Sequence, residues 1–151
     1  MKNRPEFSSL DRTEIDALLA RHHVGRLAYS QRDRVDIEPI HFVYADGWIY
    51  VRTQPGTKLA TIAHNPWVAM EVDEIESLFH WESVVLHGRL ELLEDGPHTA
   101  ARARHAKALE ALRQLIPETL TEHDPTPDRT VLCAIYVDEV EGRRARPGTG
   151  A

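Results

Sequence analysis

One short segment of the chain gathers several groups that suit an anion. It runs Arg52-Thr53-Gln54-Pro55-Gly56-Thr57-Lys58 and joins a predicted strand to a predicted helix. Its two cations, its hydroxyls and the free N–H groups of the helix N-terminus would converge, and the helix dipole also attracts negative charge. The combination suits a phosphate monoester. From spacing alone, an ordinary turn before a surface helix, with Lys58 in solvent, explains the segment equally well.

Two other segments carry groups that suit a planar ligand. The proline in Glu38-Pro39-Ile40-His41 frees backbone positions of a strand, so that amides and carbonyls could face such a ligand. Trp81-Glu82-Ser83 offers an aromatic wall and a hydroxyl. Each segment also has a plainer interpretation, the first as an edge-strand bulge and the second as core or interface packing.

Several classes of site find no support in the spacing of reactive residues. The Gly56 segment lacks the second glycine and the Lys-Ser/Thr pair of a Walker A loop, which argues against an NTPase. The nine histidines and the single cysteine form no zinc-binding spacing, and we predict no metal site. No Gly-x-Ser-x-Gly elbow supports a serine hydrolase. The carboxylates between Glu71 and Glu76 suit a solvated strand end, and the catalytic residues stay unknown.

The elements that would position these groups follow from hydrophobic periodicity. Asp11 and Glu14 form a capping-box pattern that predicts a helix over residues 11–22. Asp46-Gly47 predicts a hairpin turn, and Pro39 predicts an edge position or a bulge. The other predicted elements are strands at residues 24–29, 34–44, 48–53, 67–73, 81–93 and 130–137, and helices at residues 57–64 and between Pro97 and Pro117.

This order of elements favours one mainly β domain with flanking helices. Hairpin-linked strands at such close spacing favour an antiparallel barrel over a parallel sheet with crossover helices. At 151 residues the chain suits a single domain. We expect an N-terminal arm at residues 1–10, the domain at residues 11–143, and a flexible C-terminal tail at residues 144–151.

Composition and charge indicate which partners and which cell compartment to expect. The formal net charge is -6 at pH 7 and the basic residues alternate with carboxylates, which argues against nucleic-acid binding. No stretch resembles a secretory signal or reaches transmembrane length. Cys133 lies in an apolar run and suits a small core residue in a reducing compartment. We therefore expect a soluble, cytoplasmic protein without a membrane partner.

An ordered set of motifs carries a family resemblance. The motifs are Gly25-Arg26-Leu27-Ala28, Glu38-Pro39-Ile40-His41-Phe42-Val43-Tyr44, Asp46-Gly47-Trp48-Ile49-Tyr50, Gly56-Thr57-Lys58-Leu59, Asn65-Pro66, Val68, Glu71-Val72-Asp73, Trp81-Glu82-Ser83-Val84-Val85-Leu86-His87-Gly88 and Val137-Asp138-Glu139-Val140-Glu141-Gly142-Arg143. In this order, over most of residues 10–143, they resemble the pyridoxamine 5'-phosphate oxidase-like family. The nearest branch is the nitroimidazole-resistance type, in which a histidine commonly stands where this chain has Arg52.

The resemblance implies a six-stranded antiparallel split β-barrel of the FMN-binding type, which dimerises and shares two FMN sites between its subunits. By position, Arg52, Thr53, Thr57 and Lys58 would hold the phosphate of FMN. Glu38, Pro39 and Ile40 would line the isoalloxazine through their backbone. Trp81 and Ser83 would face the flavin from the partner subunit.

The resemblance also implies an activity. We expect an FMN-dependent oxidoreductase that reduces or oxidises an unidentified small molecule. The alternative is a non-catalytic module or sensor that holds a flavin, the deazaflavin F420 or haem, since other branches of the family use the last two. The arginine at position 52 departs from the histidine of the nitroimidazole-resistance branch, which argues against nitroreductase activity and leaves the phosphate role of this position intact.

Overall fold

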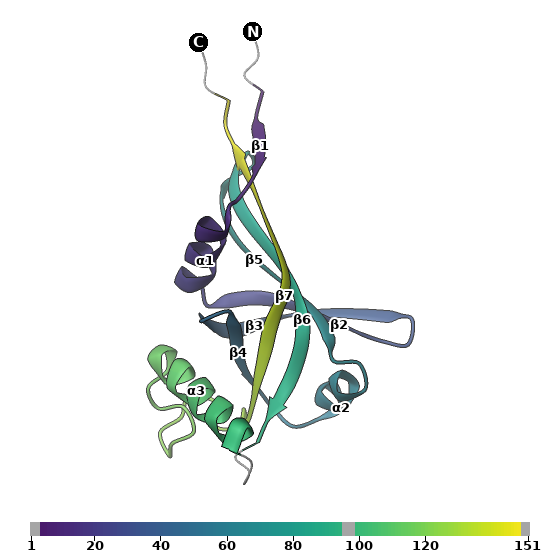
Figure 1. Cartoon of the computed structure of the whole chain (residues 1–151), viewed down its shortest axis with the longest axis vertical. Coiled ribbons are helices and arrows are strands. Elements are labelled where there is room, and N and C mark those ends of the chain that lie inside the picture. Colours follow the sequence, from purple (N-terminus) through teal and green to yellow (C-terminus); the bar gives the residue numbers. More distant parts are fainter. Residues whose placement is uncertain (1–3, 95–98, 149–151) are drawn as a thin grey trace.

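Seven strands and three helices make up the part of the chain that the computed structural model describes, residues 4–94 and 99–148 (Figure 1). In chain order they are β1 (Glu6–Ser9), α1 (Arg12–Arg21), β2 (Val24–Gln31), β3 (Arg34–Ala45), β4 (Trp48–Thr53), α2 (Thr57–His64), β5 (Trp67–Ser77), β6 (His80–Leu93), α3 (Thr99–Leu115) and β7 (Val131–Arg146).

The strands form one antiparallel sheet that closes on itself. Their order is β1-β7-β4-β3-β2-β5-β6, and a further pairing of β6 with β7 closes the ring. Six strands, β2 to β7, therefore make the ring, and β1 lies outside it against the end of β7. Closure leaves few unpaired strand edges. The antiparallel barrel predicted from the sequence is confirmed, with β1 as an additional strand.

Both ends of the described chain differ from the predicted arm and flexible tail. β1 pairs with the end of β7, from Glu6 opposite Arg146 to Ser9 opposite Arg143 (Figure 1). The guanidinium of Arg146 donates to Glu82 at 3.0 Å. The expectation of a free tail is therefore wrong up to Arg146, because residues 143–146 pair with β1 and a carboxylate distant in sequence holds Arg146. Residues 149–151 lie outside the described residues.

Local signals in the sequence explain several boundaries. The capping box of α1 is present, since the side chain of Asp11 accepts from the backbone of Glu14 and that of Glu14 accepts from Asp11. Asp46 and Gly47 have φ of 52° and 81°, as the tight hairpin turn requires. Pro39 pairs with β2 without a register shift, while β4 pairs only from Phe42 onward. The edge position predicted for Pro39 is confirmed.

The main hydrophobic core lies inside the ring. Each ring strand contributes buried side chains, among them Leu27, Phe42, Ile49, Met70, Leu86 and Ile135. Helix α1 adds Ile15, Leu18 and Leu19 to the same cluster. Each fully buried leucine contributes about 1.5–3 kcal/mol to stability. A second cluster lies under α3 and contains Val43, Tyr50, Ala108, Ala111, Leu112 and Leu132.

Ring closure makes a prediction at Gly88. The register between β6 and β7 shifts at His87 and Gly88, and a Cβ on Gly88 would collide with the carbonyl oxygen of Tyr136. We expect Gly88→Ala to lower the free energy of unfolding by about 1–3 kcal/mol, because the backbone of β7 would have to move. Urea unfolding measures the effect, and Glu91→Ala on the exposed face of β6 is the control. Equal midpoints for the two variants would contradict the prediction.

Candidate functional site

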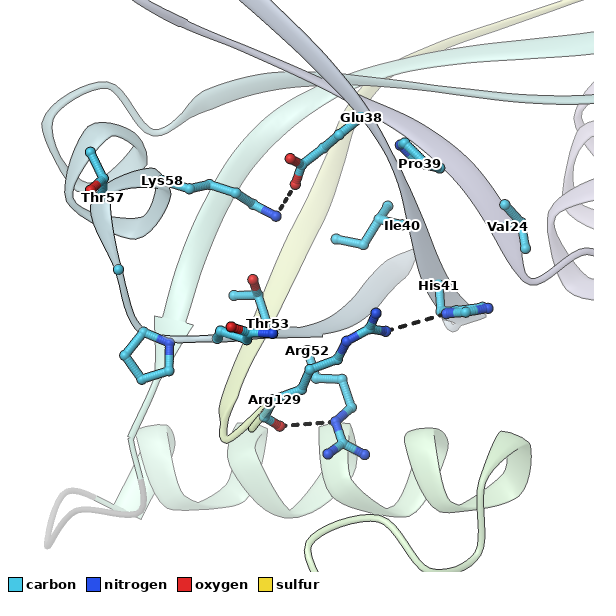
Figure 2. A pocket seen from close by; sticks show the side chains of 13 residues that line it. Val24, Glu38, Pro39, Ile40, His41, Arg52, Thr53, Thr57, Lys58 and Arg129 are labelled. Carbon is cyan, nitrogen blue, oxygen red and sulfur yellow. Dashed lines mark hydrogen bonds and ion pairs between the residues drawn. The ribbon is translucent and has the colours of Figure 1, made fainter. Parts of the chain in front are cut away.

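A cavity of about 600 Å³ opens between β3, the end of β4 and the start of α2 (Figure 2). Seven of the nine predicted site residues line it, namely Glu38, Pro39, Ile40, Arg52, Thr53, Thr57 and Lys58. Six residues outside the predicted set also line it, namely Val24, His41, Gln54, Pro55, Gly56 and Arg129. Trp81 and Ser83 are not among the residues that line it.

The N-terminus of α2 borders this cavity. Strand β4 ends at Thr53, and α2 begins at Thr57 with Gly56 as its N-cap. No side chain caps the first turn of α2. The first N–H groups of a helix have no partner within the helix, and they carry the positive end of its dipole. This corner of the cavity therefore presents backbone donors to an anion.

Lys58 faces β3 across the cavity. Its Nζ binds Oε1 of Glu38, and both side chains remain partly accessible (Figure 2). An ammonium group has three donors, so two of them stay available to a ligand. The ion pair holds the lysine over the cavity and leaves it able to bind a second anion.

Arg52 has a different role from the one expected. Only 6% of the residue is exposed, and its Nη1 and Nη2 donate to the carboxylate of Asp124 at 3.3 and 2.5 Å. Nη2 also donates to the carbonyl of Thr126 at 2.9 Å, and Nε donates to that of Arg129 at 3.0 Å. In Figure 2 the guanidinium points to the loop before β7, away from Lys58. Direct phosphate binding by Arg52 does not fit this arrangement, in which Arg52 anchors the loop.

Asp124 organises the same loop from its other side. Its carboxylate accepts the backbone N–H of Leu120 at 2.8 Å and that of Thr126 at 2.9 Å. The hydrogen bonds from Arg52 hold the pKa of this carboxyl well below its usual range, against the opposing effect of burial, and the backbone donors lower it further. The charged form is thus fixed in place, and the loop brings Arg129 to the cavity.

His41 and Arg129 meet at the far side of the cavity from α2. Nη1 of Arg129 lies 3.4 Å from Nδ1 of His41 (Figure 2). His41 ends the Glu38-Pro39-Ile40-His41 segment, so its place beside the cavity was within reach of sequence reasoning, although its side chain was not predicted as a site group. Arg129 was not, because it is separated from Arg52 by 77 residues and lies in a loop without periodic pattern.

Trp81 and Ser83 lie on β6, away from this cavity. The ring of Trp81 packs near that of Phe7, with centroids 6.2 Å apart. The hydroxyl of Ser83 donates to Oε2 of Glu71 at 3.1 Å. Their expected contact with a flavin bound to a second subunit stays a prediction.

The carboxylates of β5 are less uniform than a solvated strand end. Burial and, after it, the neighbouring Asp73 together raise the pKa of Glu71 to about 7, against the opposing effects of Ser83 and Arg26. Nη1 of Arg26 lies 3.6 Å from both carboxylates. Glu74 behaves in the opposite way, because its hydrogen bonds with the guanidinium of Arg21 lower its pKa to about 2.

Among the described residues, no His, Cys, Asp and Glu side chains form a group of three or more that could hold a metal ion. No helix in this part of the chain is long and apolar enough to cross a membrane. Burial raises the pKa of the Cys133 thiol to about 12, which makes it a poor nucleophile.

The sequence and the fold both match known proteins. The sequence pattern of the family described as "Pyridoxamine 5'-phosphate oxidase" matches residues 11–144. An uncharacterized protein of Rhizobium meliloti is 31% identical over 84 residues, which are 56% of this chain and 56% of that protein. The chain thus matches little more than half the length of this curated relative.

Solved structures share the fold over nearly the whole chain. A FAD-binding protein from Mesorhizobium loti is 27% identical with a TM-score of 0.73, covering 93% of this chain and 98% of that one. The FAD binding protein from Mycobacterium smegmatis is 26% identical with a TM-score of 0.69, covering 92% and 99%. A 5-nitroimidazole antibiotic resistance protein from Bacteroides thetaiotaomicron is 15% identical with a TM-score of 0.72, covering 95% and 90%. This last likeness concerns the fold alone.

A double-variant cycle tests the anchoring of the loop. Arg52→Ala and Asp124→Ala should each lower the melting temperature, because either change leaves a buried charge without its partner. The double variant should lose less than the sum of the two. Thermal unfolding followed by circular dichroism measures all three variants. The exposed pair Arg12 and Asp16, treated in the same way, is the control and should show little coupling.

The coupling between Arg52 and Asp124 should also weaken as the pH falls. Because the folded-state pKa of Asp124 is lowered, its stabilising effect is present above the ordinary value of 3.8 and is lost as the pH falls further. Additive losses at neutral pH would show that the pair does not hold the loop.

Glu71 should destabilise the fold as the pH rises. Its pKa is raised from 4.5 to about 7, so its stabilising contribution is full below 4.5 and is lost as the pH rises through 7. Glu71→Gln should therefore reduce the loss of melting temperature between about pH 5 and pH 8. Glu74→Gln is the matched control and should instead destabilise at neutral pH. An unchanged pH profile for Glu71→Gln would count against the raised pKa.

Proposed function

This chain belongs to the pyridoxamine 5'-phosphate oxidase family, and from that premise we propose that it binds FMN in the cavity beside α2 and acts as a flavin-dependent oxidoreductase. One observation carries the proposal: the uncapped N-terminus of α2 and the ammonium of Lys58 lie across a single cavity from the edge of β3. One wall suits a phosphate and the other a planar ring. We further propose that the protein is a cytoplasmic homodimer.

The α2 side of the cavity fits a phosphate by its chemistry. The backbone donors of the first turn and the two remaining donors of Lys58 are joined by the hydroxyls of Thr53 and Thr57. Neither hydroxyl has a hydrogen-bond partner among the described residues. Anions at a helix N-terminus gain from the backbone donors and from the dipole together. The site therefore supports a phosphorylated flavin over riboflavin.

The β3 side fits the planar ring of a flavin. Along residues 38–41 the edge of β3 that faces away from β2 has no strand partner within residues 4–94 and 99–148, because pairing with β4 begins only at Phe42. Backbone amides and carbonyls are therefore free to meet a ring edge on this side. The cavity volume of about 600 Å³ lies within the range of small-ligand sites, roughly 300–1,000 Å³.

When bound, a flavin would supply the redox chemistry, by moving electrons between a reductant and a small molecule. The chain supplies binding and orientation. Lys58 and α2 would fix the phosphate, the backbone at Pro39 and Ile40 would fix the ring, and Glu38 keeps the lysine in place. Correct placement of reactants alone lowers a barrier by several kcal/mol, up to roughly 7–11 kcal/mol in favourable cases.

Exposed apolar side chains support the homodimer. Val35 and Ile37 on β3 are 73% and 67% exposed, and Trp67 on β5 is 54% exposed. Apolar surface of this kind is often covered by a partner. A second copy of the chain would also be needed to bring Trp81 and Ser83 to the flavin, since neither lines the cavity of its own chain.

The absorption spectrum of the purified protein tests the proposal directly. We expect bound flavin, with bands at roughly 370 and 450 nm, either as purified or after addition of FMN. FAD and riboflavin added in parallel show which form is preferred. Oxidation of reduced nicotinamide with an electron acceptor would support an enzyme, whereas bound flavin with negligible turnover would support a storage or sensor module. Protein that stays colourless after FMN is added would reject the proposal.

The Lys58 side chain makes a sharper prediction. Lys58→Ala should weaken FMN binding by about 1–3 kcal/mol through loss of a charge-assisted contact, and riboflavin binding should change little. Titration calorimetry with both ligands measures the difference. Lys107→Ala, on the exposed face of α3, removes the same charge elsewhere and is the control. If Lys58→Ala bound FMN with unchanged affinity, the proposed position of the phosphate beside α2 would be contradicted.

A further inference from the structure

Three cations line the cavity, and their surroundings differ. Arg52 donates its hydrogen bonds to the carboxylate of Asp124 and to two backbone carbonyls of the loop. Lys58 shares its charge with Glu38 on the α2 side. Among the residues that the structure describes, Arg129 pairs with no carboxylate, and the one side-chain contact of its guanidinium is with Nδ1 of His41 at 3.4 Å. Its charge is therefore the least compensated of the three.

The backbone of Arg129 is held firmly although its side chain is not. Its carbonyl accepts from Nε of Arg52 at 3.0 Å, and its N–H donates to the carbonyl of Thr126 at 3.1 Å. The buried ion pair between Arg52 and Asp124 fixes the same stretch of loop. The two arginines thus have different roles: Arg52 holds the loop, and the guanidinium of Arg129 points into the cavity.

Arg129 and the α2 corner lie on opposite sides of the cavity. Figure 2 shows Thr57 and Lys58 on the α2 side, and the guanidinium of Arg129 directed toward His41. A single phosphate bound at the N-terminus of α2 leaves the charge of Arg129 uncompensated. An uncompensated guanidinium in a partly enclosed site favours a second anion, and its planar fork matches a carboxylate with two parallel hydrogen bonds.

We infer that Arg129 binds the carboxylate of an anionic substrate, opposite the phosphate of the flavin, and that Arg52 and Asp124 position it. The inference rests on the proposed function, since it places the substrate beside a flavin whose phosphate lies at α2. The proposed substrates are small planar carboxylates, because such a molecule can bind the guanidinium of Arg129 while its plane lies against the β3 side of the cavity. Arg52 and Asp124 act through the loop and touch neither ligand.

Benzoate and its neutral analogue benzamide test the inference on the FMN-loaded protein. Each is titrated while the flavin absorption bands are followed, and calorimetry gives the affinity. We expect benzoate to bind at least tenfold more tightly than benzamide. Arg129→Gln should abolish this preference and leave FMN affinity unchanged, whereas Arg129→Lys should retain part of it. Arg12→Gln, an exposed arginine on α1 that does not line the cavity, should behave as wild type.

The positioning pair is tested with the same readout. Asp124→Asn should reduce the preference for benzoate over benzamide in protein that is still folded and still binds FMN, as its melting curve and flavin spectrum show. A purely structural role would instead lower both affinities together. Equal binding of benzoate and benzamide by wild type, or loss of FMN affinity in Arg129→Gln, would overturn the inference. Failure of wild type to bind FMN would overturn the proposed function itself.

Discussion

The buried ion pair between Arg52 and Asp124 is the contact on which the candidate site depends. Arg52 comes from the end of β4, next to the turn that leads into α2, and Asp124 comes from the loop that precedes β7. Their bond therefore ties together the two segments that enclose one side of the cavity. Breaking the ion pair would leave a buried charge without a partner, which is energetically costly. The paired arrangement of Arg52 and Asp124 is therefore strongly preferred once the barrel has formed.

This constraint explains why two arginines that are adjacent in space do different things. An arginine whose donors are saturated by a carboxylate and by carbonyls has little left for a ligand, whatever its position in the sequence suggests. Arg129 instead lines the cavity with its side chain, because the loop that Arg52 anchors places it there. A histidine at position 52 could not make this four-bond anchor, because an imidazole has at most two N–H donors.

The sequence predicted the parts of the fold that depend on local patterns. The capping box at Asp11, the hairpin at Asp46-Gly47 and the edge position of Pro39 each follow from the chemistry of one or two residues. The corner from Thr53 to Lys58 was found in the same way, since strand, glycine and helix follow one another directly. Pairing of β1 with the end of β7 escaped prediction, because a short exposed strand has no apolar alternation to reveal it. The partners of Arg52 and Arg129 escaped it too, since they are contacts across the fold.

The apolar surface outside the ring bears on how the site is completed. Residues on the outer face of a closed sheet are normally polar, yet Val35 and Ile37 on β3 and Trp67 on β5 are exposed, and both strands pair with β2. Burial of such a surface against a partner would remove apolar area from water, which is favourable. Trp81 and Ser83, on β6, cannot turn toward the cavity of their own chain without breaking the pairing that closes the ring. If they contribute to the site, they must do so in a dimer, and the closure that stabilises each barrel would then be the reason that the site is shared.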